Sequence, residues 1–349
     1  MPGLDAWRGT VPAVLFANPA ARSGGSRDAI RQASEMLDVA GVPHRFIPTE
    51  PNRGTVDLVR RVIDDDGVRV VIAMGGDGTF AEVAKGVLGS GHASEVVLGM
   101  LPTGTANDQG KSFGLRAGSA ALPVNVGVIA AGAVTSIDAG RIEVHADERL
   151  LHRDLFFDSA SIGFGADALI ARNHDRELVG KIPLVGMIYR DMLVYAGAVA
   201  RKFAESYVSD VKFDLAVDID GQPHNFDSLL DVIIKNTAVF GGEWVLDPDT
   251  RPDDGKFELV PIYGRRDLTS KLFASLRHLP IDSDRLRDLG IEHSQPIAGR
   301  RFAITVTQPG RAGWPAAQLD GEEIPAGRRY LIEALPRCLN LIVPRAQLA

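Results

Sequence analysis

Residues 71–83, VIAMGGDGTFAEV, are the stretch that decides the fold of the first half of this chain. An apolar run breaks into the polar loop 75–79, GGDGT, and a helix-like pattern resumes at once. Glycines in such a loop allow close approach to a bulky anion, because they carry no Cβ. The N–H groups and the dipole at the start of the following helix favour negative charge in the same place. The stretch therefore predicts a strand, an anion-binding loop and a helix.

Asp77 makes this loop unusual, because its negative charge would repel the anion that the rest of the loop favours. A carboxylate in this place indicates a bridging cation, a bound hydroxyl or a proton to be accepted. This combination is more typical of nucleotide-binding sites than of a plain turn. The alternative, from the residues alone, is a structural turn in which Asp77 caps the helix.

Strand-like and helix-like patterns alternate on both sides of this loop. Strands that alternate with helices predict parallel βαβ units, and ligands of such sheets bind at the carboxyl ends of the strands. We expect the polar loops to converge on one nucleotide site. The predicted strands are 11–17, 44–49, 68–74 and 96–102, and the polar loops are 18–26, 75–79 and 103–108.

From about residue 137, short β-rich segments linked by turns replace this alternation. Asp220-Gly221, Asp254-Gly255 and Asp320-Gly321 are dipeptides typical of hairpins. We therefore predict an α/β nucleotide domain over residues 1–136 and a mostly antiparallel β-sandwich domain over 137–325. Residues 326–349 are expected to return to the first domain.

Composition narrows the function classes. A length of 349 residues predicts two domains, and the net charge of −7 argues against nonspecific binding to nucleic acid. The only cysteine, Cys338, excludes an intrachain disulfide and fits a reducing cytosol. A signal peptide is not indicated, and no apolar run approaches the roughly 18 residues of a spanning helix. We expect a cytoplasmic protein. An apolar stripe at 185–203 that carries Arg190 predicts either a core helix or an amphipathic surface that touches lipid.

Two acidic turns in the second half are candidates for chemistry. The turn 320–322, DGE, holds two carboxylates, and phosphoryl transfer to an alcohol needs a carboxylate near the incoming hydroxyl. An exposed hairpin is the alternative, and the turn 220–222, DGQ, is similar but lacks the second acid. The loop 247–255 concentrates carboxylates, which predicts either a site for a hard cation or a solvated acidic turn.

Five segments, in this order, resemble the diacylglycerol kinase catalytic family, which includes bacterial soluble lipid kinases and the sphingosine and ceramide kinases. The segment 157–168, FDSASIGFGADA, also resembles the part of the family that opens the second domain. The resemblance runs from about residue 11 to 345. The five segments are NPAARSGG at 18–25, MGGDGTFAEV at 74–83, LGMLPTGTAND at 98–108, LDPDTRPDDGKFELVPI at 246–262 and QLDGEEI at 318–324.

The resemblance implies a first domain like those of NAD kinase and diacylglycerol kinase, and ATP bound in the cleft between two domains. It implies Mg²⁺-dependent phosphorylation of the hydroxyl of diacylglycerol or a related lipid alcohol. By matching motif position, the base is Asp320, with Glu322 beside it as the alternative, and Asp77 organises Mg²⁺ and the phosphates. A structural magnesium site is implied at the Asp254 side chain and at the backbone carbonyls of two neighbours, Arg251 and Lys256. Nucleotide contacts are implied for Asn18, Pro19, Ala20, Ala21, Arg22, Thr49, Gly75, Gly76, Asp77, Gly78, Thr79, Phe80, Ala81 and Thr105.

Two positions depart from the family pattern and concern nucleotide or substrate preference. Ala81 stands where many members carry asparagine, and Gln109 stands where an aromatic residue often follows the GTAND motif. Two other functions stay open. One is an NAD kinase, whose family shares the GGDG loop but carries a different second loop. The other is a protein that binds nucleotide or lipid without turnover.

The expected partners are a lipid substrate and a membrane surface that the protein contacts peripherally, and a homodimer is left open. Nucleic acid is not expected. The identity of the lipid and the choice between ATP and GTP also stay open.

Overall fold

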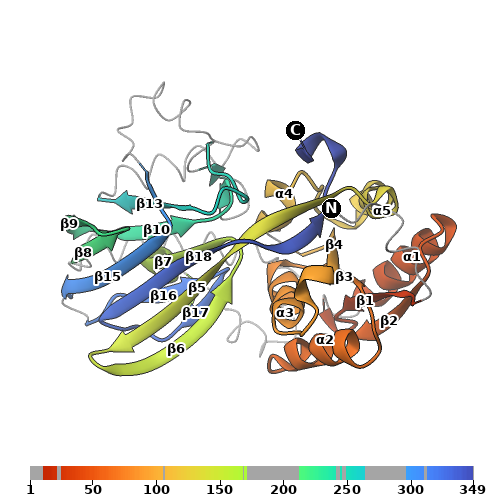
Figure 1. Ribbon diagram of the computed structural model, residues 1–349, viewed down its shortest axis with the longest axis horizontal. Helices are drawn as coiled ribbons and strands as arrows, with labels where there is room; N and C mark the ends of the chain where they lie inside the picture. Colours follow the sequence, from red (N-terminus) through yellow and green to blue (C-terminus); the bar gives the residue numbers. More distant parts are fainter. Residues whose placement is uncertain are drawn as a thin grey trace, which may run out of the picture. The chain divides into compact units, whose positions relative to one another are not determined.

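The computed structural model describes residues 11–21, 25–104, 107–167, 169–170, 212–240, 244–245, 249–263, 296–309 and 313–348 (Figure 1). The chain divides into two compact units. Unit 1 comprises Met1–Ala139 and Pro336–Ala349, and unit 2 comprises Gly140–Leu335. The expected boundaries lay after residues 136 and 325. Residues 326–335 group with unit 2, because the first part of strand β18 pairs there with β15.

Unit 1 is built on a parallel sheet with the strand order β2-β1-β3-β4-β18. Its central strands are almost entirely buried apolar residues, as expected for strands that are covered on both faces. The α/β prediction for this unit is confirmed. The strands are β1 (Ala13–Ala17), β2 (His44–Pro48), β3 (Val70–Gly75), β4 (Val97–Pro102) and the end of β18 (Arg329–Ile342).

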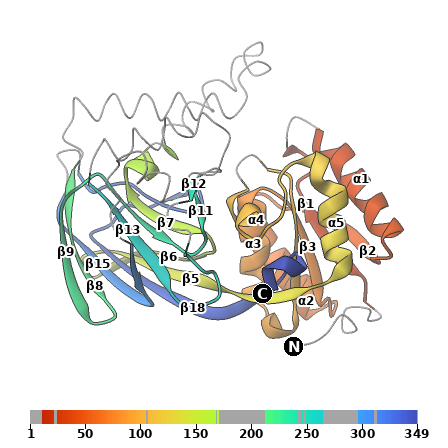
Figure 2. The same ribbon diagram turned by 90° about the horizontal axis from the view of Figure 1, so that it is seen from above.

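Helices cover both faces of this sheet (Figure 2). Helices α1 and α5 pack together, as do α2 and α3. Ile30 and Leu37 of α1 and Ile129 of α5 share a buried cluster with Leu15 of β1 and Ile72 of β3, so helical spacing brings these apolar residues to one face. The helices are α1 (Gly25–Val39), α2 (Gly54–Asp64), α3 (Asp77–Leu88), α4 (Asp108–Ser112) and α5 (Leu122–Ala131), with short 3-10 turns at Ala93–Glu95, Ser119–Ala121 and Arg345–Leu348.

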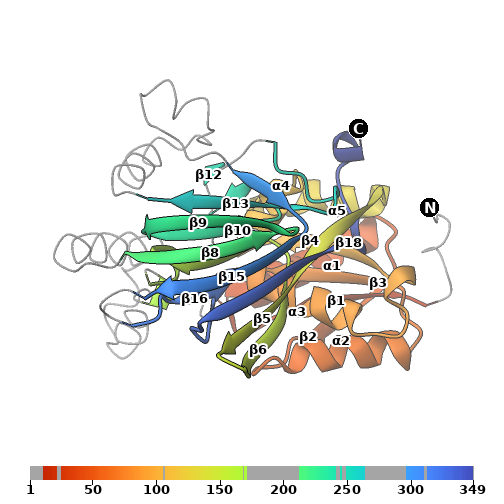
Figure 3. The ribbon, with the colours of Figure 1, turned by 60° about the vertical axis from the view of Figure 1, so that its left-hand side comes forward.

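Unit 2 is a sandwich of two sheets, which can be followed in Figure 3. One sheet has the order β18-β15-β8-β9 and continues from β18 through β5 to β6. The other has the order β14-β13-β10-β7-β16-β17 and is antiparallel throughout. Apolar side chains from both sheets form one buried cluster, so the predicted mostly antiparallel β-sandwich is confirmed.

The strands of unit 2 alternate buried and exposed residues where one face meets solvent, as β8 does. Strand β5 begins in unit 1, and its larger part lies in unit 2. The strands are β5 (Val134–Ala146), β6 (Arg149–Phe156), β7 (Ser159–Gly163), β8 (Phe213–Ile219), β9 (Gln222–Leu229), β10 (Asp231–Lys235), β11 (Val239–Phe240), β12 (Trp244–Val245), β13 (Phe257–Ile262), β14 (Ile297–Gly299), β15 (Arg301–Gln308), β16 (Ala317–Leu319) and β17 (Glu322–Ile324).

Three sequence expectations differ from the structure or lie outside it. The segment 155–162, LFFDSASI, is one of the β-rich segments expected in the second half, but it is not one strand, because β6 ends at Phe156 and β7 begins at Ser159. Asp254-Gly255 leads into β13, which pairs with β10 and β14, so this dipeptide does not join two paired strands. The stripe at 185–203 lies outside the described residues. Among the described helices, none has both the length and the hydropathy that a membrane span requires.

Candidate functional site

The loops implicated in nucleotide binding begin side by side at one edge of the sheet in unit 1. Ala17 at the end of β1 lies opposite Met74 of β3, and Gly75 lies opposite Pro102 at the end of β4. The N–H of Thr49, just after β2, donates to the carbonyl of Ala17 at 3.0 Å. Four parallel strands therefore end together, and the loops that follow them share the edge where ligands of α/β sheets bind.

The loops after β3 and β4 are joined by hydrogen bonds. The N–H groups of Thr103 and Gly104 donate to the carbonyl of Gly75 at 2.7 and 3.0 Å. A Cβ on Gly104 would lie 2.3 Å from the Cα of Gly76, so no larger residue fits there without moving the backbone. Glycine at both positions therefore lets the two loop backbones pack directly against each other.

Asn107 closes the second loop and was not among the residues singled out from the sequence. Its Oδ1 accepts the N–H of Gly104 at 2.9 Å, and its Nδ2 donates to the carbonyl of Gly104 at 2.9 Å. Its φ of 55° lies in the left-handed region, which asparagine tolerates better than most residues. An asparagine directly before a helix start was the available sequence signal for this role.

Asp77 is the first residue of α3 and connects the two loops to α4. Its Oδ1 accepts the backbone N–H of Gln109 at 3.3 Å. The Gln109 side chain is fully buried, and its amide has no hydrogen-bond partner among the described residues. A buried polar amide without a described partner therefore lies at the second position of α4.

The other predicted nucleotide contacts differ in their surroundings. Asn18 is exposed just after β1, where its Oδ1 accepts the N–H of Ala20 at 2.9 Å. Phe80 and Ala81 are 2% and 5% exposed, so neither offers a nucleotide an accessible side chain. Arg22 and Thr105 lie outside the described residues, and the remaining positions (Pro19, Ala21, Thr49, Gly75, Gly76, Gly78 and Thr79) lie in the strand-end loops or the first turn of α3.

Asp320 of unit 2 occupies the turn between β16 and β17. Its φ of 47° and the φ of 80° at Gly321 are both positive, as in the tight turns of two-residue hairpins. Its carboxylate accepts three consecutive backbone N–H groups, from Phe157 to Oδ2 at 2.8 Å and from Asp158 and Ser159 to Oδ1 at 2.8 and 3.0 Å. We call residues 157–159 the nest, because their successive N–H groups converge on one anionic group. The nest explains why β6 and β7 are separate strands.

Burial and, to a smaller extent, the nearby carboxylate of Asp158 together raise the pKa of Asp320 to about 7, although the three N–H groups of the nest oppose the rise. A carboxyl group whose pKa lies near neutral pH can accept a proton under physiological conditions. Glu322, the alternative base, is half-buried and pairs with Leu319 at the start of the hairpin.

The acidic loop before β13 carries the implied structural magnesium site. Asp254 is exposed, and its Oδ1 accepts the N–H of Lys256 at 2.9 Å. This turn holds the Asp254 carboxylate against the backbone N–H of Lys256. Arg251 forms an ion pair with Asp253 at 3.2 Å. Among the described residues, no group of three or more His, Cys, Asp and Glu side chains is placed to hold a metal ion.

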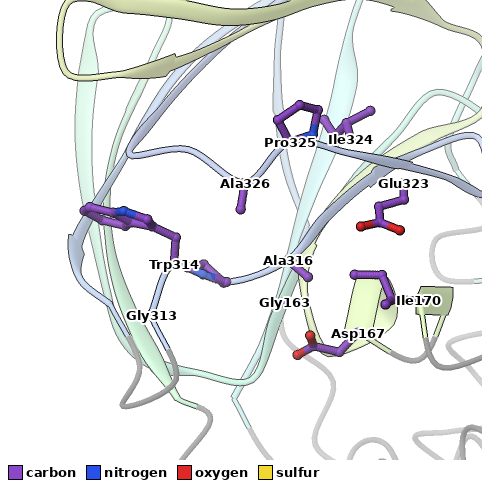
Figure 4. Close-up of a pocket in the computed structure, with 11 residues that line it drawn as sticks. Gly163, Asp167, Ile170, Gly313, Trp314, Ala316, Glu323, Ile324, Pro325 and Ala326 are labelled. Atoms are coloured by element: carbon purple, nitrogen blue, oxygen red, sulfur yellow. The ribbon is translucent and has the colours of Figure 1, made fainter. Parts of the chain in front are cut away.

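A pocket of about 560 Å³ lies in unit 2, near the end of the β16–β17 hairpin that is away from Asp320. Figure 4 shows the Trp314 ring on one side and the carboxylates of Asp167 and Glu323 on the other. Most of the lining is apolar, which suits the hydrocarbon part of a ligand. The lining residues are Gly163, Asp167, Ile170, Gly313, Trp314, Pro315, Ala316, Glu323, Ile324, Pro325 and Ala326.

Asp231 of β10 is buried close to the pocket-lining Asp167. Its Oδ2 accepts the N–H of Gly165 at 2.7 Å, and its Oδ1 accepts the hydroxyl of Ser161 at 3.2 Å. Burial raises the pKa of Asp231 to about 7, and the negative charge of Asp167 adds to the rise. This carboxyl group fixes the start of the segment that lines the pocket.

Comparisons with known proteins identify relatives of this chain. The family described as diacylglycerol kinase catalytic domain matches residues 12–142. The probable lipid kinase YegS of Salmonella arizonae is 36% identical over 290 residues, which cover 83% of this chain and 81% of that protein. A probable lipid kinase, YegS-like, of Enterobacter sp. (strain 638) is 26% identical over 279 residues, 80% of this chain and 79% of that protein.

A crystal structure of a diacylglycerol kinase from Bacillus anthracis str. Sterne shares the fold. Its TM-score is 0.64 at 15% identity, and the match covers 96% of this chain and 97% of that one. Together with the relative that is 36% identical over most of both chains, these findings decide the family. The chain belongs to the diacylglycerol kinase catalytic-domain family, among the probable lipid kinases of the YegS type.

Proposed function

We propose that this protein transfers the γ-phosphoryl group of ATP, with Mg²⁺, to the hydroxyl of diacylglycerol or a related lipid alcohol. Membership of a lipid kinase family supports phosphoryl transfer to a lipid. One structural observation carries the proposal further. Asp320 is a half-buried residue whose carboxyl group has a pKa raised to about 7 and is held by three backbone N–H groups. Such a group is suited to take the proton of an alcohol that attacks a phosphorus atom.

ATP would bind at the strand-end edge of unit 1. The start of α3 offers N–H groups and the positive end of a helix dipole, and the glycines at 76 and 104 let the two loop backbones pack against each other. The hydrogen bonds between the loops after β3 and β4 hold this surface in shape without a ligand. A preorganised surface that favours negative charge supports binding of a triphosphate.

Mg²⁺, when bound, would neutralise phosphate charge in the transition state. Asp77 fits that role, because it is the carboxylate at the start of α3, and the Gln109 N–H contacts one of its oxygens. A structural ion would be held by the side chain of Asp254 and by the carbonyls of Arg251 and Lys256. The turn that folds Asp254 onto the N–H of Lys256 supports that assignment.

The lipid would bind in unit 2, with part of its hydrocarbon in the pocket lined by Trp314, Ile324 and Ala326. Asp320 would accept the proton as the alcohol oxygen bonds to the γ-phosphorus, and ADP would leave. Positioning and charge neutralisation then supply most of the rate, because the protein forms no covalent bond. Substrates of this class reside in bilayers, so we propose a cytoplasmic protein that contacts the membrane peripherally.

A lipid-panel kinase assay read by mass spectrometry tests this function. Purified protein is incubated with mixed vesicles that contain diacylglycerol, a long-chain base or ceramide, with ATP or GTP, and with Mg²⁺ or EDTA. We expect one phosphorylated lipid with ATP and Mg²⁺, and none with EDTA. Phosphorylation of NAD alone would instead identify an NAD kinase. Bound ATP with no phosphorylated lipid would identify a binding protein without turnover.

A further inference from the structure

The nest that holds Asp320 is itself held from its opposite side by residues 235–237 of unit 2. The backbone N–H of Asn236 donates to the carbonyl of Asp158 at 2.8 Å, and the Asn236 Nδ2 donates to the carbonyl of Phe157 at 2.8 Å. The N–H groups of the same nest bind the Asp320 carboxylate. One short segment is therefore clamped between Asn236 and Asp320.

A buried ion pair forms the second part of this clamp. The Nζ of Lys235 lies 3.0 Å from Oδ1 of Asp158, and the two side chains are only 1% and 6% exposed. Lys235 also donates to the carbonyl of Val239 at 2.6 Å. The hydroxyl of Thr237 donates to Asp158 Oδ1, and the hydroxyl of Ser159 donates to Asp158 Oδ2 at 3.1 Å. Asp158 thus has partners on both of its carboxylate oxygens.

Strand pairing fixes the position of the lysine. Lys235 lies directly opposite Ser159 in the antiparallel ladder of β10 and β7. Both strands are central in their sheet, so the ammonium group is delivered to the nest by rigid elements. A group held this way can impose a geometry on its neighbours.

A gain in stability does not by itself explain the buried ion pair of Lys235 and Asp158. Removing two charges from water costs a free energy similar to the one that their attraction returns. Apolar residues can therefore often replace a buried ion pair without loss of stability. The turn at Asp320 does not need the pair either. Asp220 forms a similar turn in an exposed position, where its carboxylate accepts the N–H groups of Arg300 and Arg301 at 2.8 and 2.9 Å.

We infer that Asp158 and Lys235 are positioning residues that hold the nest in shape and set the charge that the Asp320 carboxylate experiences. The inference rests on the proposed role of Asp320 as the base. The charged groups of this cluster are the carboxylates of Asp158 and Asp320 and the ammonium group of Lys235. Glu322 lies two residues beyond Asp320 in the same hairpin. The carboxylate of Asp158 opposes ionisation of Asp320, and Lys235 offsets part of that negative charge because it pairs with Asp158.

Two single substitutions should move the titration in opposite directions. Asp158→Asn keeps the shape of the side chain, removes the negative charge and leaves Lys235 positive. The pKa of Asp320 should therefore fall, on the order of one unit. Lys235→Met removes the positive charge that offsets the Asp158 carboxylate. The pKa of Asp320 should therefore rise by a similar amount.

The readout is the ¹³C chemical shift of the aspartate carboxyl groups, followed against pH in the full-length protein. A second readout is the acidic limb of the pH profile of kcat/KM for lipid phosphorylation, which should move with the NMR titration. Asp220→Asn is the matched control, because it removes the carboxylate of a similar turn, and it should move neither readout. Shifts in the same direction, or an unchanged Asp320 titration, would overturn the inference.

A double variant and the NMR readout keep the possible outcomes distinguishable. If either single variant fails to fold, the double variant Asp158→Asn/Lys235→Met removes both buried charges and leaves no uncompensated ion. In it the pKa of Asp320 should fall below that of the unsubstituted protein, and an unchanged value would contradict the inference. The NMR titration does not depend on turnover, so a protein with the expected shifts and no lipid product would refute the proposed function alone.

Discussion

Asp220 and Asp320 lie in matching turns, but Asp320 is half-buried and Asp220 is exposed. Both residues precede a glycine and have positive φ values of 52° and 47°. Both carboxylates accept backbone N–H groups from a neighbouring segment. Burial raises the pKa of Asp320 to about 7, whereas Asp220 is exposed. The same turn chemistry is therefore converted into a proton acceptor at only one of the two positions.

Asp320→Asn should reduce lipid phosphorylation by about 10²-fold or more, because a general base contributes roughly that factor. The amide keeps one acceptor oxygen but turns an NH₂ group toward the nest, so a lower thermal midpoint is also expected. Initial rates with ATP and the preferred lipid give the activity, and circular dichroism gives the midpoint. Asp220→Asn is the control and should keep its activity. Near-normal turnover in Asp320→Asn would shift the role of base to Glu322.

Gly104→Ala should disrupt the nucleotide edge of unit 1. Its Cβ would stand 2.3 Å from the Cα of Gly76, so one of the two loops must move. We expect a loss of stability of about 1–3 kcal/mol, the usual cost of overpacking, together with weaker ATP binding. Chemical denaturation and isothermal titration calorimetry measure the two effects.

Gly127→Ala is the matched control for Gly104→Ala. Gly127 lies within α5, and a Cβ there would meet no heavy atom within 4 Å. Alanine has the higher helix propensity, so this variant should be as stable as the unsubstituted protein or slightly more stable. Equal ATP affinity in the two variants would show that the close contact between the loops is not needed for binding.

Asp231→Asn should change how stability depends on pH. The pKa of Asp231 is raised from 3.8 to about 7 in the folded protein. Between those values the unfolded chain loses this proton while the folded protein keeps it, so the stabilisation is complete below the unfolded pKa and is lost as pH rises. Asparagine does not titrate, and it can accept from Gly165 and donate to Ser161.

The stability of Asp231→Asn relative to the unsubstituted protein should therefore increase between pH 5 and 7, by up to about 1.4 kcal/mol per pH unit, and level off above pH 7. Urea unfolding at several pH values measures the difference. A constant difference across this range would mean that Asp231 is ionised in the folded protein throughout.

Ala326→Trp should fill part of the pocket in unit 2. Ala326 is half-buried in the lining, where Figure 4 places it between Trp314 and Ile324. We expect kcat/KM for the lipid to fall at least tenfold, with unchanged affinity for ATP, because a bulky ring removes space for hydrocarbon. Val124→Trp, at a half-exposed position on α5, is the size-matched control. Unchanged lipid kinetics would place the hydrocarbon elsewhere.

The elements of unit 1 followed from the sequence because their signals are local. Apolar runs of about six residues alternate with helical stripes, and the loop 75–79 separates a strand from a helix as predicted. The break inside 155–162 had no comparable signal. That segment is β-rich on both sides of residues 157–158. Strand β6 ends there only because the N–H groups of these two residues bind the side chain of Asp320, more than 160 residues away.

The candidate site was predictable where one motif supplies all the parts. The turn that holds Asp320 was expected from the residues 320–321, and the positive φ values confirm it. The partners of Asp158 were not predictable, because Lys235 lies 77 positions along the chain and approaches only through strand pairing. A lysine within a β-rich run is ordinarily a solvent-facing residue.

By itself, the sequence determined the α/β and antiparallel halves, the family and the loops that carry the motifs, because these depend on short-range spacing and on residue types in order. Only the tertiary structure decided which strand ends meet at one edge and which of the two turn aspartates is withdrawn from solvent. It also decided that a lysine-aspartate pair lies behind the nest. These features depend on pairings between distant segments and on how far each carboxyl group is removed from water, which is what separates Asp320 from Asp220.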